Sequence, residues 1–139
     1  MKKESGLTFF EILIMLLVLG VVAVVTLPKF RAQVETSREG RTKASLGDLR
    51  GALAIYYSDN FGLYPSDEGT PETRLSSSIV PKYLKTMPAV DLTHLYPDRL
   101  NTVEDRIDNR GDWVYSTLNG FVAVNSWKPD THGRPISSW

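Results

Sequence analysis

The sequence predicts an α+β protein in which one long N-terminal helix packs on a small C-terminal antiparallel β-sheet. The first observation is an apolar run of nineteen residues, Phe9 to Leu27, in which Glu11 is the only charged side chain. The second is an amphipathic pattern that continues the helix to about Asn60. The third is a pair of short apolar segments joined by Asn119-Gly120, a strong hairpin signal.

Composition limits what the chain can do. It has 139 residues with 16 basic and 16 acidic side chains, so its formal net charge is zero and nothing favours binding to nucleic acid. It has no cysteine, which excludes disulfide and thiolate chemistry. Apolar residues are concentrated before Pro28, so we expect an apolar stalk joined to a polar head.

The apolar run is long enough to cross a membrane. As a helix it would extend about 28 Å, close to the ~30 Å hydrocarbon core of a bilayer. Lys2 and Lys3 precede it, so the positive-inside rule places the N-terminus in the cytoplasm and the head outside the inner membrane. On length alone, the simplest interpretation is a single-pass anchor.

Glu11 indicates more than an anchor. A carboxylate in a membrane helix costs about 2.5–3.5 kcal/mol at mid-bilayer, and such residues usually have a partner. If the chain is cut after Gly6, a new α-amine on Leu7 lies about one helical turn from Glu11. The amine of one copy and the carboxylate of its neighbour could then neutralise each other and fix the axial register. The alternative is a charge tolerated at the membrane interface.

Two residues are expected to weaken the apolar helix. Pro28 lacks an amide hydrogen and clashes with the carbonyl four residues earlier, so the helix should kink or loosen just before it. Gly20 costs about 1 kcal/mol relative to alanine, and β-branched residues are frequent between the two. The segment could be helical in lipid and partly melt in a filament. The alternative is that glycine and proline are simply commoner in membrane helices.

The N-terminus resembles the signature of the type IV pilin and type II secretion pseudopilin superfamily, in the stretch Gly6-Leu7-Thr8-Phe9-Phe10-Glu11 and the apolar run after it. The resemblance implies that a prepilin peptidase removes residues 1–6 and methylates the new amine of Leu7, where the family usually has phenylalanine. It also implies that Glu11 acts in assembly and that Gly20 and Pro28 bracket the loosened helix. Residues 7–28 would form the transmembrane and filament-core helix, and residues 29–139 a periplasmic head in the family's lollipop plan.

In the head, the helix should carry an apolar face and end at a glycine. Its face is formed by Leu46, Leu49, Leu53 and Tyr56 or Tyr57, and Gly62 is the predicted C-cap. A loop and a short helical or turn segment follow. Residues 91–111 are predicted to form a surface loop, residues 112–116 and 120–125 the two strands, and residues 126–139 an irregular tail.

Parts of the head resemble the major pseudopilin of type II secretion, namely Tyr64-Pro65, residues 81–88 and residues 125–139. The family's aspartate-proline-tryptophan-glycine run is replaced by the residues at 91–94. In major pseudopilins the C-terminal loop binds calcium, and the residues here that could match as oxygen ligands are Asn125, Ser126 and Asp130. Calcium needs six or more ligands, so the alternative is a solvated loop without metal. We expect that no cofactor is required and that calcium is a possible ligand.

Nothing in the sequence favours an enzyme. The two histidines, His94 and His132, lie in predicted loops without metal-binding spacing, and we expect both to be exposed. The sequence contains no G-x-S-x-G elbow, glycine-rich phosphate loop or S-x-x-K motif.

The resemblance implies a structural subunit of the type II secretion pseudopilus, which supports protein export across the outer membrane. Its partners would be other copies in a helical filament, a prepilin peptidase, an inner-membrane assembly platform, minor pseudopilins and membrane lipid. The bacterial inner membrane would hold the subunit before assembly. One alternative is a type IV pilus subunit for adhesion, motility or DNA uptake. The other is an uncleaved single-pass protein whose head binds a soluble partner.

The predicted leader can be tested by intact-mass and N-terminal analysis of the chain from membranes that contain a prepilin peptidase. We expect a mature chain that begins at N-methylated Leu7. A chain that keeps Met1–Gly6 beside an active peptidase would favour the uncleaved anchor.

Overall fold

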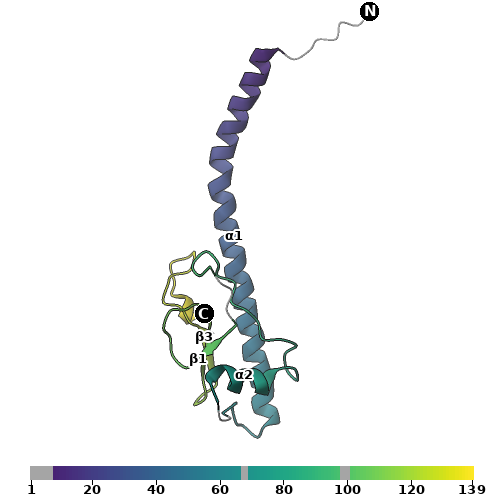
Figure 1. Ribbon diagram of the computed structural model, residues 1–139, viewed down its shortest axis with the longest axis vertical. Helices are drawn as coiled ribbons and strands as arrows, with labels where there is room; N and C mark the ends of the chain where they lie inside the picture. Colours follow the sequence, from purple (N-terminus) through teal and green to yellow (C-terminus); the bar gives the residue numbers. More distant parts are fainter. Residues whose placement is uncertain (1–7, 67–68, 98–100) are drawn as a thin grey trace, which may run out of the picture. The chain divides into compact units, whose positions relative to one another are not determined.

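The computed structural model describes residues 8–66, 69–97 and 101–139 (Figure 1). Helix α1 covers Phe9–Asp59 and helix α2 covers Pro71–Ile79. The strands are β1 (Val103–Glu104), β2 (Trp113–Ser116) and β3 (Phe121–Val124), and a 3₁₀ turn, η1, covers Ile136–Ser138. The chain divides into two compact units after Val34. We call the apolar part of α1, Phe9–Phe30, the stalk, and Glu35–Trp139 the head.

In the stalk, α1 continues as a helix through both Gly20 and Pro28. Every residue from Thr8 to Gln33 is exposed. The predicted loosening near these two positions refers to a filament and stays a prediction. The predicted boundaries of the leader and of the membrane segment also stay predictions, since residues 1–7 lie outside the described part of the chain.

In the head, the predicted apolar face of α1 is confirmed. Leu46, Leu49 and Leu53 are buried, and of the two candidate tyrosines it is Tyr56 that is half-buried while Tyr57 is exposed. The predicted helix end is confirmed as well. Gly62 has φ +79° and donates its N–H to the carbonyl of Tyr57 at 2.9 Å, a left-handed residue closing the end of the helix.

The hairpin signal at Asn119-Gly120 also correctly predicts the β2–β3 pair, which is antiparallel with Ser116 opposite Phe121. Gly120 has φ +66°, and a Cβ there would lie 2.1 Å from the Tyr64 ring, so the position requires glycine. The sheet is larger than predicted, however. Strand β1 pairs with β2 in parallel, which makes the sheet three-stranded and mixed in the order β1-β2-β3.

The prediction of a surface loop over residues 91–111 is wrong for much of the segment. Leu92, Tyr96 and Val103 are buried in the same core as the leucines of α1. The sequence concealed this because β1 has only two residues, too few for a recognisable alternation, and because side-chain bonds to α1 hold residues 91–94. The backbone N–H of Asp91, for example, donates to the buried Thr42 hydroxyl at 3.0 Å.

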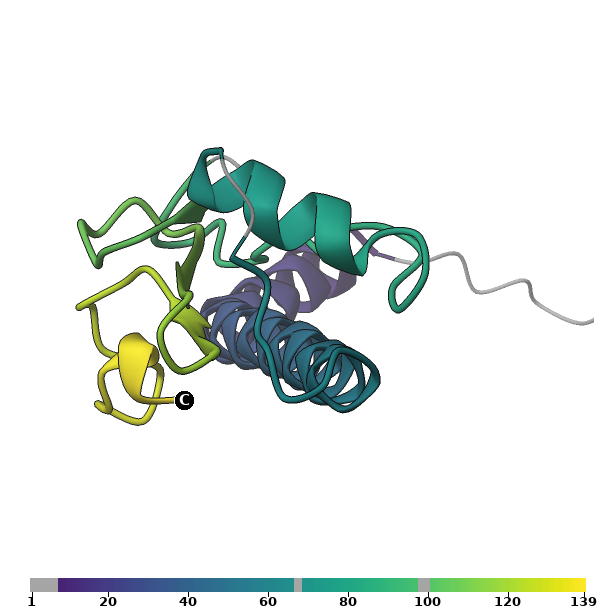
Figure 2. The ribbon, with the colours of Figure 1, turned by 90° about the horizontal axis from the view of Figure 1, so that it is seen from below.

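The core of the head therefore lies between α1, α2, the sheet and two irregular segments. Figure 2 looks nearly along α1 and shows α2 crossing on one side of the head and the C-terminal segment, in yellow, on another. Trp113 on β2 is fully buried, and its indole N–H donates to the Pro88 carbonyl at 2.7 Å. Such bonds satisfy the polar atoms of large core residues.

Candidate functional site

The N-terminus of α1 holds the first group of predicted site residues. Gly6 and Leu7 lie outside the described residues. Glu11 is described, and its carboxylate accepts the backbone N–H of Thr8 at 2.7 Å and the Thr8 hydroxyl at 2.9 Å. The Thr8 hydroxyl in turn accepts the N–H of Glu11 at 3.3 Å. This reciprocal arrangement is a capping box, which satisfies donors at the start of a helix.

The capping box was not predicted, although its signal is in the sequence. Thr8-Phe9-Phe10-Glu11 has the T-x-x-E spacing that defines the motif. The box gives Glu11 a local partner in a single copy of the chain. It supplies hydrogen bonds without a countercharge, and among the described residues no cation pairs with this carboxylate.

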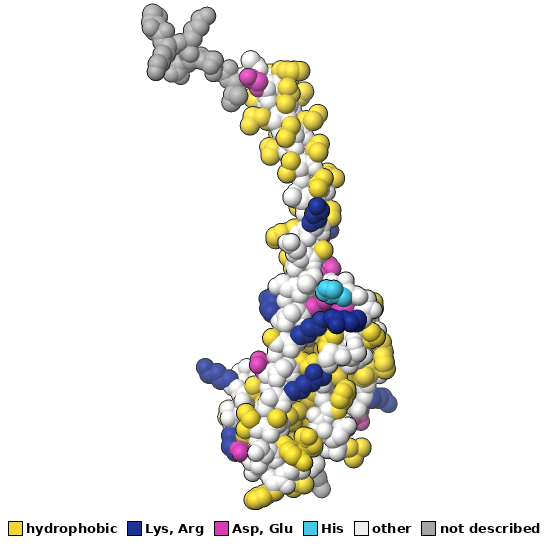
Figure 3. Space-filling view, turned by 180° about the vertical axis from the view of Figure 1, so that it is seen from behind, with side chains coloured by type: hydrophobic (Ala, Val, Ile, Leu, Met, Phe, Trp, Pro, Cys, Tyr) yellow, Lys and Arg dark blue, Asp and Glu magenta, His cyan; other side chains and the backbone are white. Residues whose placement is uncertain are grey.

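The stalk is a continuous apolar surface. Its most apolar 18-residue window has a mean hydropathy of 2.8, and none of that window is buried within the chain. By length and composition α1 is the one helix in the described residues that could cross a membrane. Figure 3 shows hydrophobic side chains over the surface of this segment, with charged side chains concentrated on the head.

The second group of predicted site residues lies around the C-terminal loop, residues 126–139. Asn125, at its start, is fully buried. Its Nδ2 donates to Asp108 Oδ1 and Asp112 Oδ1, both at 2.6 Å. Its Oδ1 accepts the backbone N–H groups of Asp108 and Asn109 at 2.7 and 2.8 Å. The amide therefore fastens residues 108–112 to the end of β3.

Ser126 is linked to the Asn125 network, because the Tyr96 hydroxyl beside it also lies 2.7 Å from Asn109 Oδ1. Asp130 belongs to a separate network. Ser126 Oγ lies 2.8 Å from the Tyr96 hydroxyl and accepts the backbone N–H of Lys128 at 3.2 Å. Asp130 has no exposed side-chain surface. Its Oδ1 accepts the backbone N–H groups of His132 and Arg134, both at 2.9 Å.

The other carboxylate oxygen of Asp130 faces donors from three side chains. Oδ2 accepts the Trp139 indole N–H at 3.1 Å and lies 3.4 Å from the Arg134 guanidinium and 3.5 Å from the Lys43 ammonium. Burial by itself would raise the pKa of Asp130. The backbone N–H groups of Arg134 and His132, the Trp139 indole and the charge of Arg134 outweigh burial, and they hold this pKa well below its usual range.

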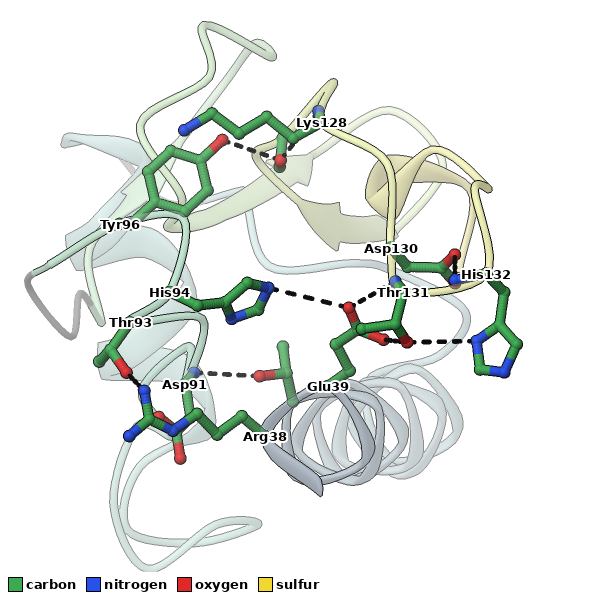
Figure 4. A network of polar contacts seen from close by, with 12 residues as sticks. Arg38, Glu39, Asp91, Thr93, His94, Tyr96, Lys128, Asp130, Thr131 and His132 are labelled. Carbon is green, nitrogen blue, oxygen red and sulfur yellow. Dashed lines mark hydrogen bonds and ion pairs between the residues drawn. The ribbon is translucent and has the colours of Figure 1, made fainter. Parts of the chain in front are cut away.

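Glu39, a buried glutamate on α1, accepts hydrogen bonds from Thr131, the residue after Asp130. Glu39 is 2% exposed, and it accepts the backbone N–H of Thr131 at 2.8 Å and the Thr131 hydroxyl at 2.7 Å (Figure 4). His94 Nε2 lies 3.9 Å from Glu39 Oε1, on the other side of the carboxylate. No motif predicted this network, because its members are separated by tens of residues in sequence.

The two histidines differ in exposure. His132 is exposed, as predicted. The prediction that His94 is exposed is wrong, because only 14% of its side chain is accessible. The surrounding residues are polar and suggested a solvated loop, but they pack on α1. For example, the Arg38 side chain donates to the Thr93 hydroxyl.

The predicted calcium ligands do not fit a calcium ion in this geometry. Asn125, Ser126 and Asp130 are buried, which also excludes a solvated loop for them, but their side-chain oxygens already accept protein donors. A carboxylate beside an ammonium and a guanidinium is a poor ligand for calcium, which needs six to eight oxygens. One carboxylate oxygen each from Glu39 and Asp130 and one His132 nitrogen lie within 4.8 Å of one another, but hydrogen bonds already engage both carboxylates.

The low pKa of Asp130 predicts how stability depends on pH. The pKa of an aspartate in an unfolded chain is about 3.9. The contribution of Asp130 to folding stability is therefore present above about pH 5 and is lost as the pH falls toward its lower folded-state pKa. We expect Asp130→Asn to melt below the wild type at about pH 7, with a difference that shrinks toward about pH 3. Thermal unfolding of the full chain in detergent measures this, with exposed Asp105→Asn as control. A difference independent of pH would contradict the assignment.

Comparison with known proteins gives matches at low identity. No protein-family model matches the chain, and no solved structure gives a significant match. The fimbrial protein EcpC of Eikenella corrodens is 26% identical over 86 residues, which cover 62% of this chain and 54% of that protein. Type II secretion system core protein G of Klebsiella pneumoniae is 27% identical over 88 residues, covering 63% and 62%. Type IV major pilin protein PilE of Neisseria gonorrhoeae is 28% identical over 82 residues, covering 59% and 48%.

The matched regions thus cover about half of the fimbrial protein and of the pilin, and less than two thirds of the type II secretion protein. All three are named as fimbrial, pilin or type II secretion components, and none carries the name of an enzyme. The order of elements, a long apolar N-terminal helix followed by a small C-terminal sheet, agrees with these similarities. The chain therefore has a pilin-like fold and is similar in sequence to pilins and to type II secretion G proteins.

Proposed function

We propose that the chain is a structural subunit that assembles through the stalk into a helical filament. The observation that carries this proposal is the stalk itself, which is apolar on all sides and exposed throughout. A helix that is hydrophobic all round needs an apolar environment on every side. Lipid can supply that environment before assembly, and the stalks of other copies can supply it afterwards.

Moving the stalk from lipid to filament should cost little. Burying a Val, Leu, Ile or Phe side chain is worth about 1.5–3 kcal/mol relative to water, and lipid already provides most of that. The transfer exchanges one apolar environment for another, so specificity must come from contacts that lipid cannot make. Glu11, the one charged side chain in the stalk before Lys29, is the group best suited to give it.

The hydrogen bonds of Glu11 come from uncharged groups, so they do not neutralise its negative charge. In one copy the carboxylate accepts two bonds from Thr8. Removal of residues 1–6 would create an amine on Leu7, next to the capping threonine. In a packed bundle, the amine of one copy paired with Glu11 of the next would set the axial register. An ion pair in low dielectric is strong enough to reject other registers.

We assign the filament to the type II secretion pseudopilus, in the inner membrane with the head on the periplasmic side. Relatives named type II secretion system core protein G come from three organisms, Klebsiella pneumoniae, Pseudomonas aeruginosa and Vibrio cholerae. The resemblance of the C-terminal residues 125–139 supports the same branch. Its partners would be a prepilin peptidase, an inner-membrane platform, minor pseudopilins and lipid. A type IV pilus is the second candidate, because EcpC and PilE are also similar.

Substitutions at Glu11 separate the ion pair from the capping box. Glutamine can replace glutamate in a capping box but carries no charge, whereas leucine removes both functions. We expect Glu11→Gln and Glu11→Leu to reduce assembled filaments by more than about tenfold, the effect of about 1.4 kcal/mol, with membrane insertion unchanged. Sheared filaments are quantified against the membrane fraction.

Thr8→Ala is the matched control, because it removes the capping hydroxyl and keeps the charge of Glu11. We expect it to assemble. If Glu11→Gln assembles normally while Glu11→Leu and Thr8→Ala fail, the carboxylate acts only as a helix cap, and the ion-pair proposal is wrong.

A further inference from the structure

We propose that the C-terminal loop, residues 126–139, is locked to α1 by the chain's own cations, so that the head folds without calcium. The lock consists of Lys43 on α1 and Arg134 in the loop, both facing the buried carboxylate of Asp130. This proposal concerns the fold of a single copy and does not depend on the filament proposal.

Asp130 has no free ligand position. One carboxylate oxygen accepts two backbone N–H groups, from His132 and Arg134. The other accepts the Trp139 indole N–H and faces two positive charges at 3.4 and 3.5 Å. A calcium ion at this carboxylate would have to displace these donors and would be repelled by both cations.

Lys43 lies between two parts of the C-terminal loop. Its ammonium lies 3.5 Å from Asp130 Oδ2 and 4.2 Å from the centre of the Trp139 ring, a cation–π distance. One side chain of α1 therefore contacts both the middle and the end of the loop. A metal ion would hold a loop in the same way, by attracting several of its groups to one positive centre.

Two opposite charges on α1 bind neighbouring residues of the loop. Glu39 and Lys43 are four residues apart, so they lie on the same face of the helix one turn from each other. Glu39 accepts two bonds from Thr131, and Lys43 pairs with the preceding residue, Asp130. Consecutive loop residues are thus held by opposite charges on consecutive helical turns, which fixes the position of the loop along α1.

Near the start of the loop, the side-chain amide of Asn125 likewise takes a place between two carboxylates that a metal ion could occupy. Asp108 and Asp112 both point a carboxylate oxygen at Nδ2 of Asn125, at 2.6 Å each. Two carboxylates directed at one point are a common arrangement around a dication. Here the amide N–H groups occupy that point, and Arg110 neutralises Asp108 at 2.9 Å.

The experiment compares thermal unfolding of the full chain in detergent micelles with calcium chloride in excess and with chelator in excess. We expect wild-type melting temperatures that agree within about 1 °C, since no ligand stabilises the native state under either condition. We expect Lys43→Met, which keeps most of the side-chain volume, to melt about 4–8 °C lower in both conditions. Lys85→Met, at an exposed lysine, is the matched control and should melt with the wild type.

Two further variants test whether the effect comes from the charge of Lys43 and from its pairing with Asp130. Lys43→Arg retains the positive charge and should restore most of the loss, even if Lys43→Met does not fold. In the double variant Lys43→Met/Asp130→Asn, the loss should be smaller than the sum of the single losses, because the partners are coupled. The proposal is overturned if calcium raises the wild-type melting temperature by several degrees, or if Lys43→Met melts with Lys85→Met.

Discussion

The structure depends on a change in character along a single helix, because α1 is apolar on all sides at its start and amphipathic at its end. From Thr8 to Gln33 every residue is exposed, whereas in the head Leu46, Leu49 and Leu53 are almost fully buried. The head therefore buries apolar side chains only in the second half of the helix. The first half requires an apolar environment from outside the chain, and this unmet requirement is the physical basis of the assembly that we propose.

The head is held together by side-chain bonds as much as by regular structure. Its sheet has one strand of two residues and two of four, which is little backbone pairing for a unit of this size. The irregular segments 91–96 and 126–139 complete it through buried polar groups, among them Glu39, Asn125 and Asp130. Such networks are specific because each unpaired member would be costly in the interior. They hold the irregular segments in place in a head that has only short strands and no cysteine to form a disulfide.

Features that depend on residues close together in the sequence could be predicted, whereas features that depend on distant residues could not. The stalk, the leucine face of α1 and the Asn119-Gly120 turn are set by residues a few positions apart, and all three were predicted correctly. The capping box of Thr8 and Glu11 is equally local and could have been found by its spacing.

The missed features depend on contacts between distant residues. Strand β1 is recognisable only through its parallel pairing with β2, and it has too few residues for a pattern. Asp130 looked like an acidic calcium ligand because the sequence does not show that Lys43, from α1, reaches it. His94 looked exposed for the same reason, since Glu39 lies beside it only in the fold.

Cysteine cross-linking in the membrane tests most directly whether the stalks pack against one another. The chain has no native cysteine, so introduced thiols report only the chosen positions. Chains would carry one cysteine within residues 12–16 and one within residues 21–25, scanned in pairs, with single-cysteine chains as controls. Assembly through the stalk predicts ladders of covalent multimers beyond the dimer for some pairs, while single-cysteine chains give at most dimers. Monomers for every pair, in cells that produce the assembly machinery, would contradict assembly through this helix.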